Sequence, residues 1–534
     1  MQILSSAEMR ATDERTAQEF GISLDALMEN AGAAVARFCL REYGTAGKVV
    51  VLAGKGNNGG DGLVAARLLA DAGKQVQVLL LGRSEEVKGE AAGALARLRN
   101  EAPRVTLREV LNADDVKDAV GSAELLVDAV VGTGFKPPLR GVAAELREPV
   151  ELAGAPVVAI DLPSGWDADS TMQAVDDAYR ADAVVTFTAP KMAHVFGHLT
   201  RRTFGPVLVA EIGSPAEAVQ SDGRLHWAGA AKAIAEKPRE VNANKGKYGH
   251  VLVVGGSYGT SGAPSMASLA ALRTGAGLVT AAVPKSIVDA VAGIAPELMM
   301  APLAEGADGA VSMHSLDPLN AVIREKRIST VAIGPGLSTR ADASEFARDV
   351  VNRTNLPLVV DADALNAFAG RAADLNGEGR VLVLTPHPGE MARLLGISVK
   401  EVEADRVGLA RRFATEHKLT LVLKGWRTLI AHPDGKIAVN TTGNPAMAKG
   451  GSGDILTGIV AAMLAQYAIG GTPDEAARAV EAAVFLHGLA GDFAALANDE
   501  HTVLATDTLE HMSDAFRYRV RDGAGLTWIC GVHG

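Results

Sequence analysis

The sequence contains few cysteines and few aromatic residues, and it has no excess of positive charge. Its 534 residues include two cysteines, Cys39 and Cys530, so at most one disulfide could form, a usage typical of the reducing cytosol. Aromatic residues make up 4% of the chain, and the formal net charge is -11. A nucleic-acid-binding protein should carry a basic face and aromatic side chains on which bases stack, so we expect no nucleic-acid partner.

The sequence also has no segment of the kinds that insert into a membrane or cross it. It contains no run of about 18 apolar residues, the length that a helix needs to span a bilayer. Residues 1–10 do not combine a basic segment with an apolar one, as a secretory signal would. We therefore expect a cytoplasmic location and no membrane partner.

Glycine, in contrast, is abundant, with 58 residues in the chain. The balance of 48% hydrophobic and 22% charged residues is that of a globular protein. Many glycines together with few aromatic residues favour an α/β protein with numerous tight turns between strands and helices. At roughly 150 residues per domain, the length predicts two to four domains.

The first half of the chain alternates apolar strands with helical patterns. One helix is predicted to begin after Ser23 and to carry apolar residues at helical spacing up to Phe38, and another covers about 62–72. The predicted strands cover 48–54, 75–81, 125–131, 156–162, 183–188 and 206–212. Continuous Val, Leu and Ile runs are typical of parallel strands buried on both faces, so we predict a doubly wound fold.

The pattern stops at residues 214–224, which read as a linker, and a second α/β series follows. Its predicted strands cover 250–254, 278–283, 330–333, 356–360, 381–384 and 419–423, followed by a hairpin of 428–431 against 436–440. Two Ala-rich helices near 454–466 and 473–496 complete it. The sequence thus predicts two α/β domains, residues 1–215 and 225–515.

A glycine-rich segment, residues 54–62, follows the first predicted strand and leads into a helix. Glycines let the backbone approach a ligand, and a helix N-terminus favours anions, so this segment predicts a phosphate site. Its spacing is neither that of the dinucleotide fingerprint nor that of a Walker A loop. Two other strand ends carry Asp128 and Asp161; singly, each would be read as a turn residue, but together with the glycine segment they predict a polar pocket.

The motifs at 56–61, 128–134, 160–165 and 190–191 resemble those of the NAD(P)H-hydrate epimerase family, over about residues 1–215. The resemblance implies a Rossmann-like fold and potassium bound by Asn58, Asp128 and Ser164, with Asp161 at the reacting centre. It implies these contacts to the hydrated dinucleotide: Asn57, Asn58, Gly59, Gly60, Asp61, Gly132, Thr133, Gly134, Phe135, Lys136, Pro137, Pro138 and Asp161. Whether a carboxylate at Asp161 would shuttle a proton or stabilise a cationic ring is left open by the sequence.

The strongest motif of the second half is residues 448–458, Ala-Lys-Gly-Gly-Ser-Gly-Asp-Ile-Leu-Thr-Gly, which opens an apolar helix. Its Gly-Ser-Gly backbone and the helix N-terminus predict an anion hole for a phosphate in transfer. Asp454 beside the hole is placed to take a proton from a hydroxyl nucleophile. A structural interpretation, with packing glycines and an aspartate in the first helical turn, is the weaker alternative.

This arrangement resembles the ribokinase-like fold, and further motifs between 244 and 445 narrow the resemblance to the ADP-dependent NAD(P)H-hydrate dehydratase family, over about residues 225–515. It implies substrate contacts from Ala263, Gly336, His387 and Asp454, and nucleotide contacts from Lys424, Gly425, Trp426, Arg427, Thr428 and Gly453. The implied reaction phosphorylates the C6 hydroxyl of NADHX or NADPHX from ADP and then expels phosphate, giving NAD(P)H and AMP. Mg²⁺ is expected with ADP, because phosphoryl transfer needs charge neutralisation.

Some features depart from these families or leave alternatives. The families have glycine where this chain has Ala446, and the tail from Asp522 has no interpretation. His487, on a predicted helix, is read as a packing residue. The first alternative function is a small-alcohol kinase, and the second is an N-terminal binding module without catalysis. We also expect a homo-oligomer.

Overall fold

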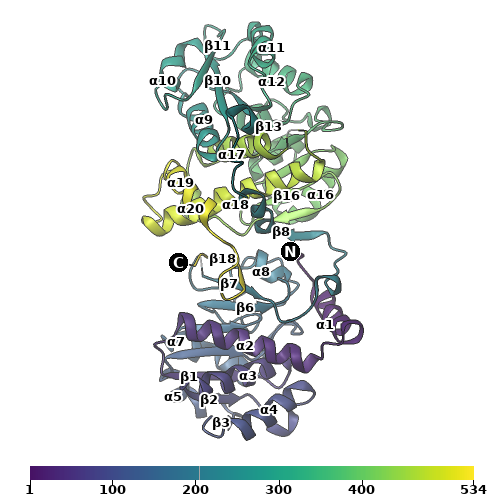
Figure 1. The fold of residues 1–534 in the computed structure, drawn as a ribbon, viewed down its shortest axis with the longest axis vertical. Coiled ribbons are helices and arrows are strands. Elements are labelled where there is room, and N and C mark those ends of the chain that lie inside the picture. The colour runs from purple at the N-terminus through teal and green to yellow at the C-terminus, as the bar shows by residue number, and fades with distance from the viewer. Residues whose placement is uncertain (204, 469, 534) are drawn as a thin grey trace. The chain divides into compact units, whose positions relative to one another are not determined.

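The computed structural model describes residues 1–203, 205–468 and 470–533 (Figure 1). The chain divides into two compact units. The first, called here the N-terminal unit, comprises Met1–Leu225 together with the segment that begins at Arg519. The second, the C-terminal unit, comprises His226–Tyr518. The end of the chain therefore belongs to the same unit as its beginning.

The N-terminal unit contains an eight-stranded sheet in the order β18-β7-β6-β5-β4-β1-β2-β3. Its strands are β1 (Lys48–Ala53), β2 (Gln75–Leu80), β3 (Thr106–Glu109), β4 (Leu125–Ala129), β5 (Val157–Ile160), β6 (Ala183–Phe187), β7 (Val207–Ala210) and β18 (Leu526–Cys530). Its helices are α1 (Ser6–Phe20), α2 (Leu24–Glu42), α3 (Asn57–Asp71), α4 (Glu90–Glu101), α5 (Lys117–Gly121), α6 (Val142–Glu145), α7 (Arg147–Leu152) and α8 (Met192–Phe196). Strands β1 to β7 are parallel, which confirms the predicted α/β fold.

The strand order reverses between β1 and β4, because β2 lies on one side of β1 and β4 on the other. In an open parallel sheet the loops after such a pair of strands turn in opposite directions, and a crevice opens at their carboxyl ends. Strands β1 and β4 are almost completely buried, as their continuous Val and Leu runs predict. The polar side chains of these two strands therefore lie near the strand ends, and those at the carboxyl ends lie at the crevice.

Helix α3 begins earlier than the sequence predicts. The predicted start is near residue 62, but the helix begins at Asn57, directly after Gly56, with Ser23 capping the preceding α2 as predicted. Asn57–Asp61 thus form the first helical turn instead of a loop. Glycine has a low helix propensity, so two glycines in this turn hide the helix from sequence reasoning.

The C-terminal tail, which the sequence left without interpretation, is strand β18. It pairs antiparallel with β7 at the edge of the N-terminal sheet, where Figure 1 shows the yellow strand beside β7. Trp528 is 4% exposed and belongs to the hydrophobic core that β1, β4 and α2 share. Its indole N–H donates to Asp522, and that carboxylate also pairs with Arg41 of α2 at 2.8 Å. The tail therefore completes the N-terminal unit.

The C-terminal unit contains a ten-stranded sheet in the order β11-β10-β9-β12-β13-β14-β15-β16-β17-β8. Its strands are β8 (Leu225–Trp227), β9 (His250–Val254), β10 (Leu278–Pro284), β11 (Met299–Leu303), β12 (Thr330–Ile333), β13 (Leu358–Val360), β14 (Leu382–Leu384), β15 (Thr420–Leu423), β16 (Leu429–Ala431) and β17 (Ile437–Val439). The strands from β11 to β15 are parallel, and β15, β16 and β17 pair antiparallel, which confirms the predicted hairpin.

The helices of this unit include the two predicted Ala-rich ones. They are α9 (Gly262–Thr274), α10 (Val288–Ala292), α11 (Leu316–Glu325), α12 (Ala341–Arg353), α13 (Ala362–Asn366), α14 (Pro388–Leu395), α15 (Val399–Ala404), α16 (Arg406–Glu416), α17 (Ser452–Tyr467), α18 (Pro473–Ala497), α19 (Asp507–Glu510) and α20 (Met512–Arg517). Among the described residues, α18 is the one helix long and apolar enough to cross a membrane by length and composition. Because 78% of its most apolar window is buried inside the protein, it is packed as a core helix.

Replacing Trp528 by alanine tests the role of the tail. We expect Trp528→Ala to destabilise the N-terminal unit by about 3–5 kcal/mol, the usual cost of removing a buried indole. Scanning calorimetry of the full chain should show a lower unfolding temperature for one of its transitions. Leu152→Ala is the matched control, because Leu152 is 75% exposed and should leave that transition in place. Equal unfolding temperatures for the two variants would contradict a structural role for β18.

Candidate functional sites

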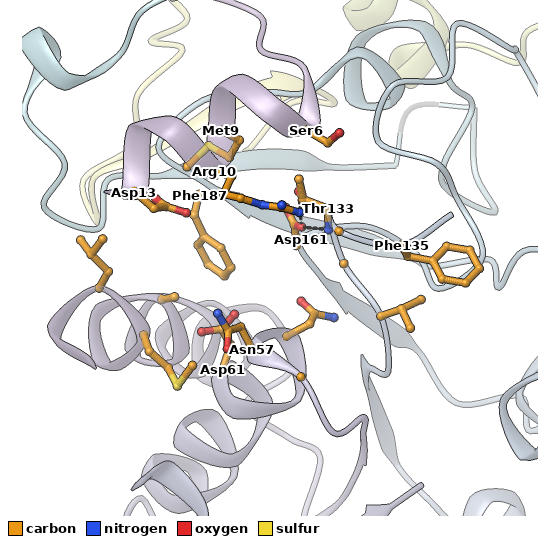
Figure 2. Close-up of a pocket in the computed structure, with 18 of the residues that line it drawn as sticks. Ser6, Met9, Arg10, Asp13, Asn57, Asp61, Thr133, Phe135, Asp161 and Phe187 are labelled. Atoms are coloured by element: carbon orange, nitrogen blue, oxygen red, sulfur yellow. Dashed lines mark hydrogen bonds between the residues drawn. The ribbon is translucent and has the colours of Figure 1, made fainter. Parts of the chain in front are cut away.

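The N-terminal unit has a cavity of about 610 Å³ at the ends of β1, β4 and β5 (Figure 2). The predicted residues that line it are Asn57, Asn58, Asp61, Gly132, Thr133, Gly134, Phe135 and Asp161. Lys191 and Phe187 also line it, from the end of β6 and the turn that follows. The cavity therefore lies at the reversal of strand order, where the fold predicts a ligand.

Asp161 is held by a complete set of hydrogen bonds. Its Oδ2 accepts from the backbone N–H and the hydroxyl of Thr133, at 2.7 and 2.6 Å. Its Oδ1 accepts from the hydroxyl of Thr186 at 2.8 Å and from Lys191 Nζ at 2.9 Å. A carboxylate has about four acceptor positions, so these four bonds occupy all of them. Asp161 also has a φ of 64°, which is uncommon for a residue other than glycine and is typical of functional sites.

The charges around Asp161 keep it ionised. Burial would raise the pKa of this carboxyl, but the ammonium of Lys191, itself fully buried, and the hydrogen bond from Thr133 hold its pKa well below the usual range. His194 fixes the backbone: its Nδ1 accepts from the N–H of Lys191, so its Nε2–H donates to the carbonyl of Asp161 at 2.6 Å. Burial lowers the pKa of His194 to about 4, so the imidazole is neutral.

A second buried carboxylate, Asp128, ends β4. It accepts from the backbone N–H and the hydroxyl of Ser164, at 2.7 and 2.5 Å, and burial raises its pKa to about 6. Asn58 lies beside Gly132 and Asp161, since a Cβ at position 132 would come within 2.9 Å of Asn58 Oδ1 and 2.8 Å of Asp161 Oδ2. No cationic side chain of the described residues is recorded as pairing with Asp128. Carboxylate, amide and hydroxyl oxygens suit a hard cation, so these residues fit the predicted potassium.

Helix α1 forms a wall of the cavity that sequence reasoning missed. Ser6, Met9, Arg10 and Asp13, at the spacing of one helical face, line it. Figure 2 shows these side chains on one side of the cavity and Asn57 and Asp61 of α3 on the other. Because this face carries a single apolar residue, Met9, between polar ones, no local pattern in the sequence marks it as part of a site.

The remaining predicted residues of this unit lie around the cavity without lining it. These are Gly59, Gly60, Asp128, Lys136, Pro137, Pro138 and Ser164. The ammonium of Lys136 pairs with Asp167 and Asp169, at 2.7 and 2.8 Å. This lysine is therefore engaged in ion pairs at the surface.

The C-terminal unit has a cavity of about 740 Å³ between the ends of β13, β14 and β15 and the start of α17. Eight of the predicted residues line it: His387, Lys424, Gly425, Trp426, Arg427, Thr428, Gly453 and Asp454. Ala263 and Gly336 do not line this cavity. They lie next to each other, because a Cβ at position 336 would be 3.1 Å from Ala263 Cβ.

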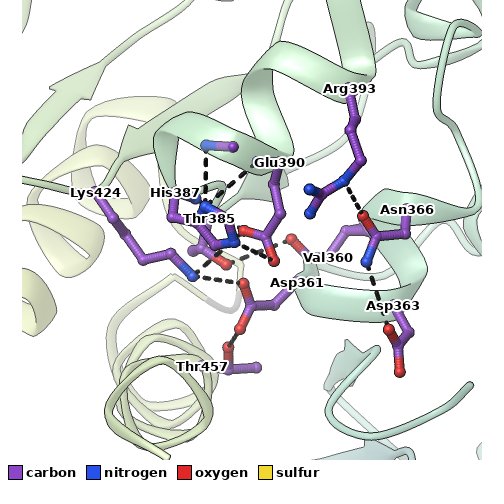
Figure 3. Close-up of polar contacts among 11 residues, drawn as sticks. Val360, Asp361, Asp363, Asn366, Thr385, His387, Glu390, Arg393, Lys424 and Thr457 are labelled. Carbon is purple, nitrogen blue, oxygen red and sulfur yellow. Dashed lines mark hydrogen bonds and ion pairs between the residues drawn. The ribbon is translucent and has the colours of Figure 1, made fainter. Parts of the chain in front are cut away.

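Lys424 is the centre of a polar network at this cavity (Figure 3). Its Nζ donates to Asp361 Oδ1 at 3.0 Å and lies 3.7 Å from Glu390 Oε2. The other oxygen of Asp361 accepts from the hydroxyl of Thr457 in α17 at 2.8 Å. Burial would lower the pKa of Lys424, but the two carboxylates raise it, so the lysine stays charged. Asp361 and Glu390 were not among the predicted site residues, although both lie in motifs that the sequence singles out.

Asp454 lies in the first turn of α17, as predicted, and differs from Asp361 in having no recorded side-chain hydrogen bond. Burial, together with the negative charge of Asp361, raises its pKa to about 6. A carboxyl with this pKa is largely deprotonated at neutral pH and is able to accept a proton. The backbone N–H groups of the turn beside it are those for which the sequence predicts an anion site.

Helix α18 supplies one wall of the same cavity. Val484, His487 and Gly488 line it, so His487, predicted as a packing residue, faces the cavity from a buried position. Its Nε2 has no hydrogen-bond partner in the described part of the chain. One turn further along, Asp492 accepts from the N–H of Gly443 and from Asn444 Nδ2 at 2.9 Å. The helix thereby fixes the loop that opens onto the nucleotide residues.

Ala446 occupies a position that tolerates it. It lies in a short 3-10 turn, Pro445–Met447, with negative φ, and its N–H donates to Asn444 Oδ1 at 3.0 Å. The glycine usual in the resembled family is therefore not required here by the backbone conformation.

Two family models match the chain. One, described as NAD(P)H-hydrate dehydratase, matches residues 251–514, and the other, described as YjeF-related protein N-terminus, matches residues 24–193. Both resemblances inferred from the motifs are thus supported by independent matches, in the expected order along the chain.

Relatives of nearly the same length match the chain from end to end. The bifunctional NAD(P)H-hydrate repair enzyme Nnr of Moorella thermoacetica is 40% identical over 97% of this chain and 97% of its own length. The bifunctional NAD(P)H-hydrate repair enzyme Nnr of Thermofilum pendens is 36% identical over 97% of this chain and 96% of its own length. A solved ADP/ATP-dependent NAD(P)H-hydrate dehydratase of Bacillus subtilis, co-crystallised with ATP and Mg²⁺, is 30% identical. The match covers 54% of this chain and 96% of the Bacillus subtilis chain, and the two structures superpose with a TM-score of 0.45.

Proposed function

The chain belongs to the family of bifunctional NAD(P)H-hydrate repair enzymes, and from this premise we propose that each unit carries one of the two activities. The epimerase is assigned to residues 1–215, with β18 added, and the dehydratase to residues 225–515. This assignment rests on one observation above the others. In each unit a large cavity lies at the carboxyl ends of parallel strands, and each of these two cavities is lined by motif residues of a different activity.

In the N-terminal unit the hydrated dinucleotide is proposed to bind with its reduced ring beside Asp161. Asn57–Asp61 and Gly132–Phe135 surround the cavity, and the start of α3 presents backbone N–H groups to the diphosphate. Epimerisation at C6 requires that a bond to this carbon break and form again. Because all acceptor positions of Asp161 are occupied and its pKa is low, the carboxylate is suited to stabilise a cationic ring and unsuited to shuttle a proton.

Potassium is proposed to bind beside this cavity, held by Asn58, Asp128 and Ser164. Asp128 is a buried carboxylate whose recorded partners are all neutral donors. When bound, the ion supplies the positive charge that this carboxylate lacks, and it thereby fixes the ends of β4 and β5 around the substrate.

In the C-terminal unit the S epimer is proposed to be phosphorylated from ADP. Asp454 takes the proton of the C6 hydroxyl while the oxygen of this hydroxyl attacks the terminal phosphorus of ADP. AMP then leaves. The C6–O bond then breaks, phosphate departs, and loss of a proton from the neighbouring carbon restores the ring double bond. Phosphate is a far better leaving group than hydroxide, which explains why the reaction begins with phosphoryl transfer.

Lys424 and the start of α17 are proposed to hold the phosphates of the nucleotide, with Ala263, Gly336 and His387 contacting the substrate. Mg²⁺ is proposed to enter with ADP and to be coordinated largely by phosphate oxygens, as this ion's preference allows. Glu390, which lines the cavity, is the side chain that would meet it. The ion neutralises charge on the transferring phosphoryl group.

We further propose a cytoplasmic, homo-oligomeric enzyme. The chain has only two cysteines, both buried, a usage typical of the reducing cytosol. Sedimentation of the purified chain tests the oligomeric state.

A mixed-epimer hydrate of NADH tests the assignment of activities. With ADP, Mg²⁺ and K⁺, absorbance of the reduced nicotinamide should recover completely for the wild type. Asp161→Asn should stop at the share of one epimer, because only the dehydratase remains, and Asp454→Asn should recover almost nothing. No recovery by the wild type with ADP or ATP would contradict the repair function and favour a small-alcohol kinase.

The dehydratase should lose activity at low pH. Asp454 is active as a base when deprotonated, and its pKa is raised to about 6, so the rate should fall about tenfold per pH unit below 6 and level off above 7. Asp454→Asn should lower the rate by about 10²–10⁴-fold, the usual contribution of a general base. Asp161→Asn, in the other unit, should keep the wild-type pH profile. A rate that is constant from pH 5 to 8 would contradict the role of Asp454.

Removal of potassium should affect one activity alone. Replacing K⁺ by tetramethylammonium is expected to slow epimerisation about tenfold or more, the scale of loss when a metal site is weakened, and to leave dehydration of the S epimer unchanged. Added K⁺ should also raise the unfolding temperature of the wild type, because a ligand of the native state stabilises it. Asp128→Asn should abolish this shift, and a shift that persists in the variant would place the ion elsewhere.

A further inference from the structure

We propose that Asp13, on helix α1, is the acid–base residue of the epimerase, and that Asp161 acts as its electrostatic partner. This inference rests on the epimerase function proposed above and adds the group that moves the proton. Helix α1 precedes the segment matched by the N-terminal family model, which begins at residue 24. The residue is therefore outside every motif that carries the resemblance.

The chemistry requires a proton donor that the recognised residues do not supply. The carbon to be epimerised carries a hydroxyl group and is bonded to the ring nitrogen. Departure of the hydroxyl as water needs one proton, and the nitrogen lone pair then forms a C=N⁺ bond. Water adds to the opposite face of the ring, and the proton returns to the donor. Atoms and charge balance without any further reactant.

Few ionisable groups line the cavity in the described structure. They are Arg10, Asp13, Lys55, Asp61, Asp161 and Lys191. The guanidinium of Arg10 has donors and no acceptor position, and Lys55 pairs with Glu86 at 2.9 Å. Lys191 is committed to Asp161 and to the hydroxyl of Thr186, at 2.9 and 2.8 Å. Asp161 has all of its acceptor positions occupied. The two aspartates that remain are Asp13 and Asp61.

Asp13 is the better placed of these two. Its Oδ1 is buried and has no hydrogen-bond partner within the described residues, so this oxygen is available to a bound substrate. It faces the cavity from the wall opposite α3, where Asp61 lies (Figure 2). Asp61 belongs to the helical turn assigned to substrate binding, and burial raises its pKa well above the usual range.

The surroundings of Asp13 suit proton transfer in both directions. Burial raises its pKa to about 6; the charge of Lys191 opposes the rise, and those of Asp161 and Glu14 add to it. The charged and titratable groups that face it are Arg10 and Glu14 on its own helix, Asp61 of α3, Asp161 and Lys191. A carboxyl with this pKa gives and accepts protons near neutral pH, whereas Asp161 cannot.

The test measures conversion of the R epimer to the S epimer by the full chain, with the spontaneous rate subtracted. Asp13→Asn should lower kcat by about 10²–10⁴-fold, with KM changed by less than about threefold, since an interaction limited to the transition state affects kcat alone. Dehydration of the S epimer by the same variant should be unchanged. Glu19→Gln is the matched control, because Glu19 is an exposed carboxylate on the same helix that does not line the cavity, and this variant should keep the wild-type rate.

The pH profile provides the second measurement. Asp13 must be protonated to release water, so the wild-type rate should fall as pH rises above about 6, the reverse of the trend expected for the dehydratase. Asp13→Asn should remove this dependence. If Asp13→Asn does not fold, the pH profile of the wild type decides. A wild-type epimerisation rate that does not change between pH 5 and pH 8 overturns the inference.

Two outcomes separate this inference from the function on which it rests. A wild type that does not epimerise would refute the proposed function itself. A wild type that epimerises, with Asp13→Asn retaining its rate and pH profile, would refute only the role of Asp13. If Asp61→Asn lost the pH dependence of epimerisation and Asp13→Asn kept it, the acid–base role would belong to Asp61. That result would likewise overturn the inference.

Discussion

Both units depend on a parallel sheet that is covered on its two faces. Inside such a sheet an unpaired polar side chain is costly, so the groups that perform chemistry lie where the strands end. In the N-terminal unit these ends carry Asp128 and Asp161, and in the C-terminal unit Asp361 and Lys424. Each of these side chains is held by named hydrogen bonds, and the cavity forms around them.

The two cavities treat their carboxylates in opposite ways, and the difference comes from where each lysine is placed. Lys191 donates directly to Asp161 and holds it ionised in a buried position. Lys424 donates to Asp361, whereas burial and the negative charge of Asp361 raise the pKa of Asp454 to about 6. One residue is thereby a fixed negative charge and the other an acceptor of protons. The same contrast, within the first cavity, separates Asp161 from Asp13.

Segments remote from the motifs complete each site. Helix α1 forms a wall of the first cavity, and β18, from the end of the chain, closes the edge of the same sheet. Helix α18 places His487 in the second cavity and fixes the loop at Gly443 through Asp492. These contacts join residues far apart in the sequence, and each has its effect through position and not through a recognisable local pattern.

The sequence by itself determined the two α/β units, the strands of the parallel sheets, the hairpin and the motif residues at both cavities, because buried strands and glycine-rich turns leave local patterns that physical rules can read. It could not place the start of α3, since glycines mask a helix, nor interpret β18, whose partner β7 lies some 300 residues away in the chain. Only the tertiary structure decided that Asp161 is saturated with donors, that Asp13 lines the same cavity, and that Lys424 pairs with Asp361. The protonation state of a carboxyl depends on its neighbours in space, and sequence distance does not encode them.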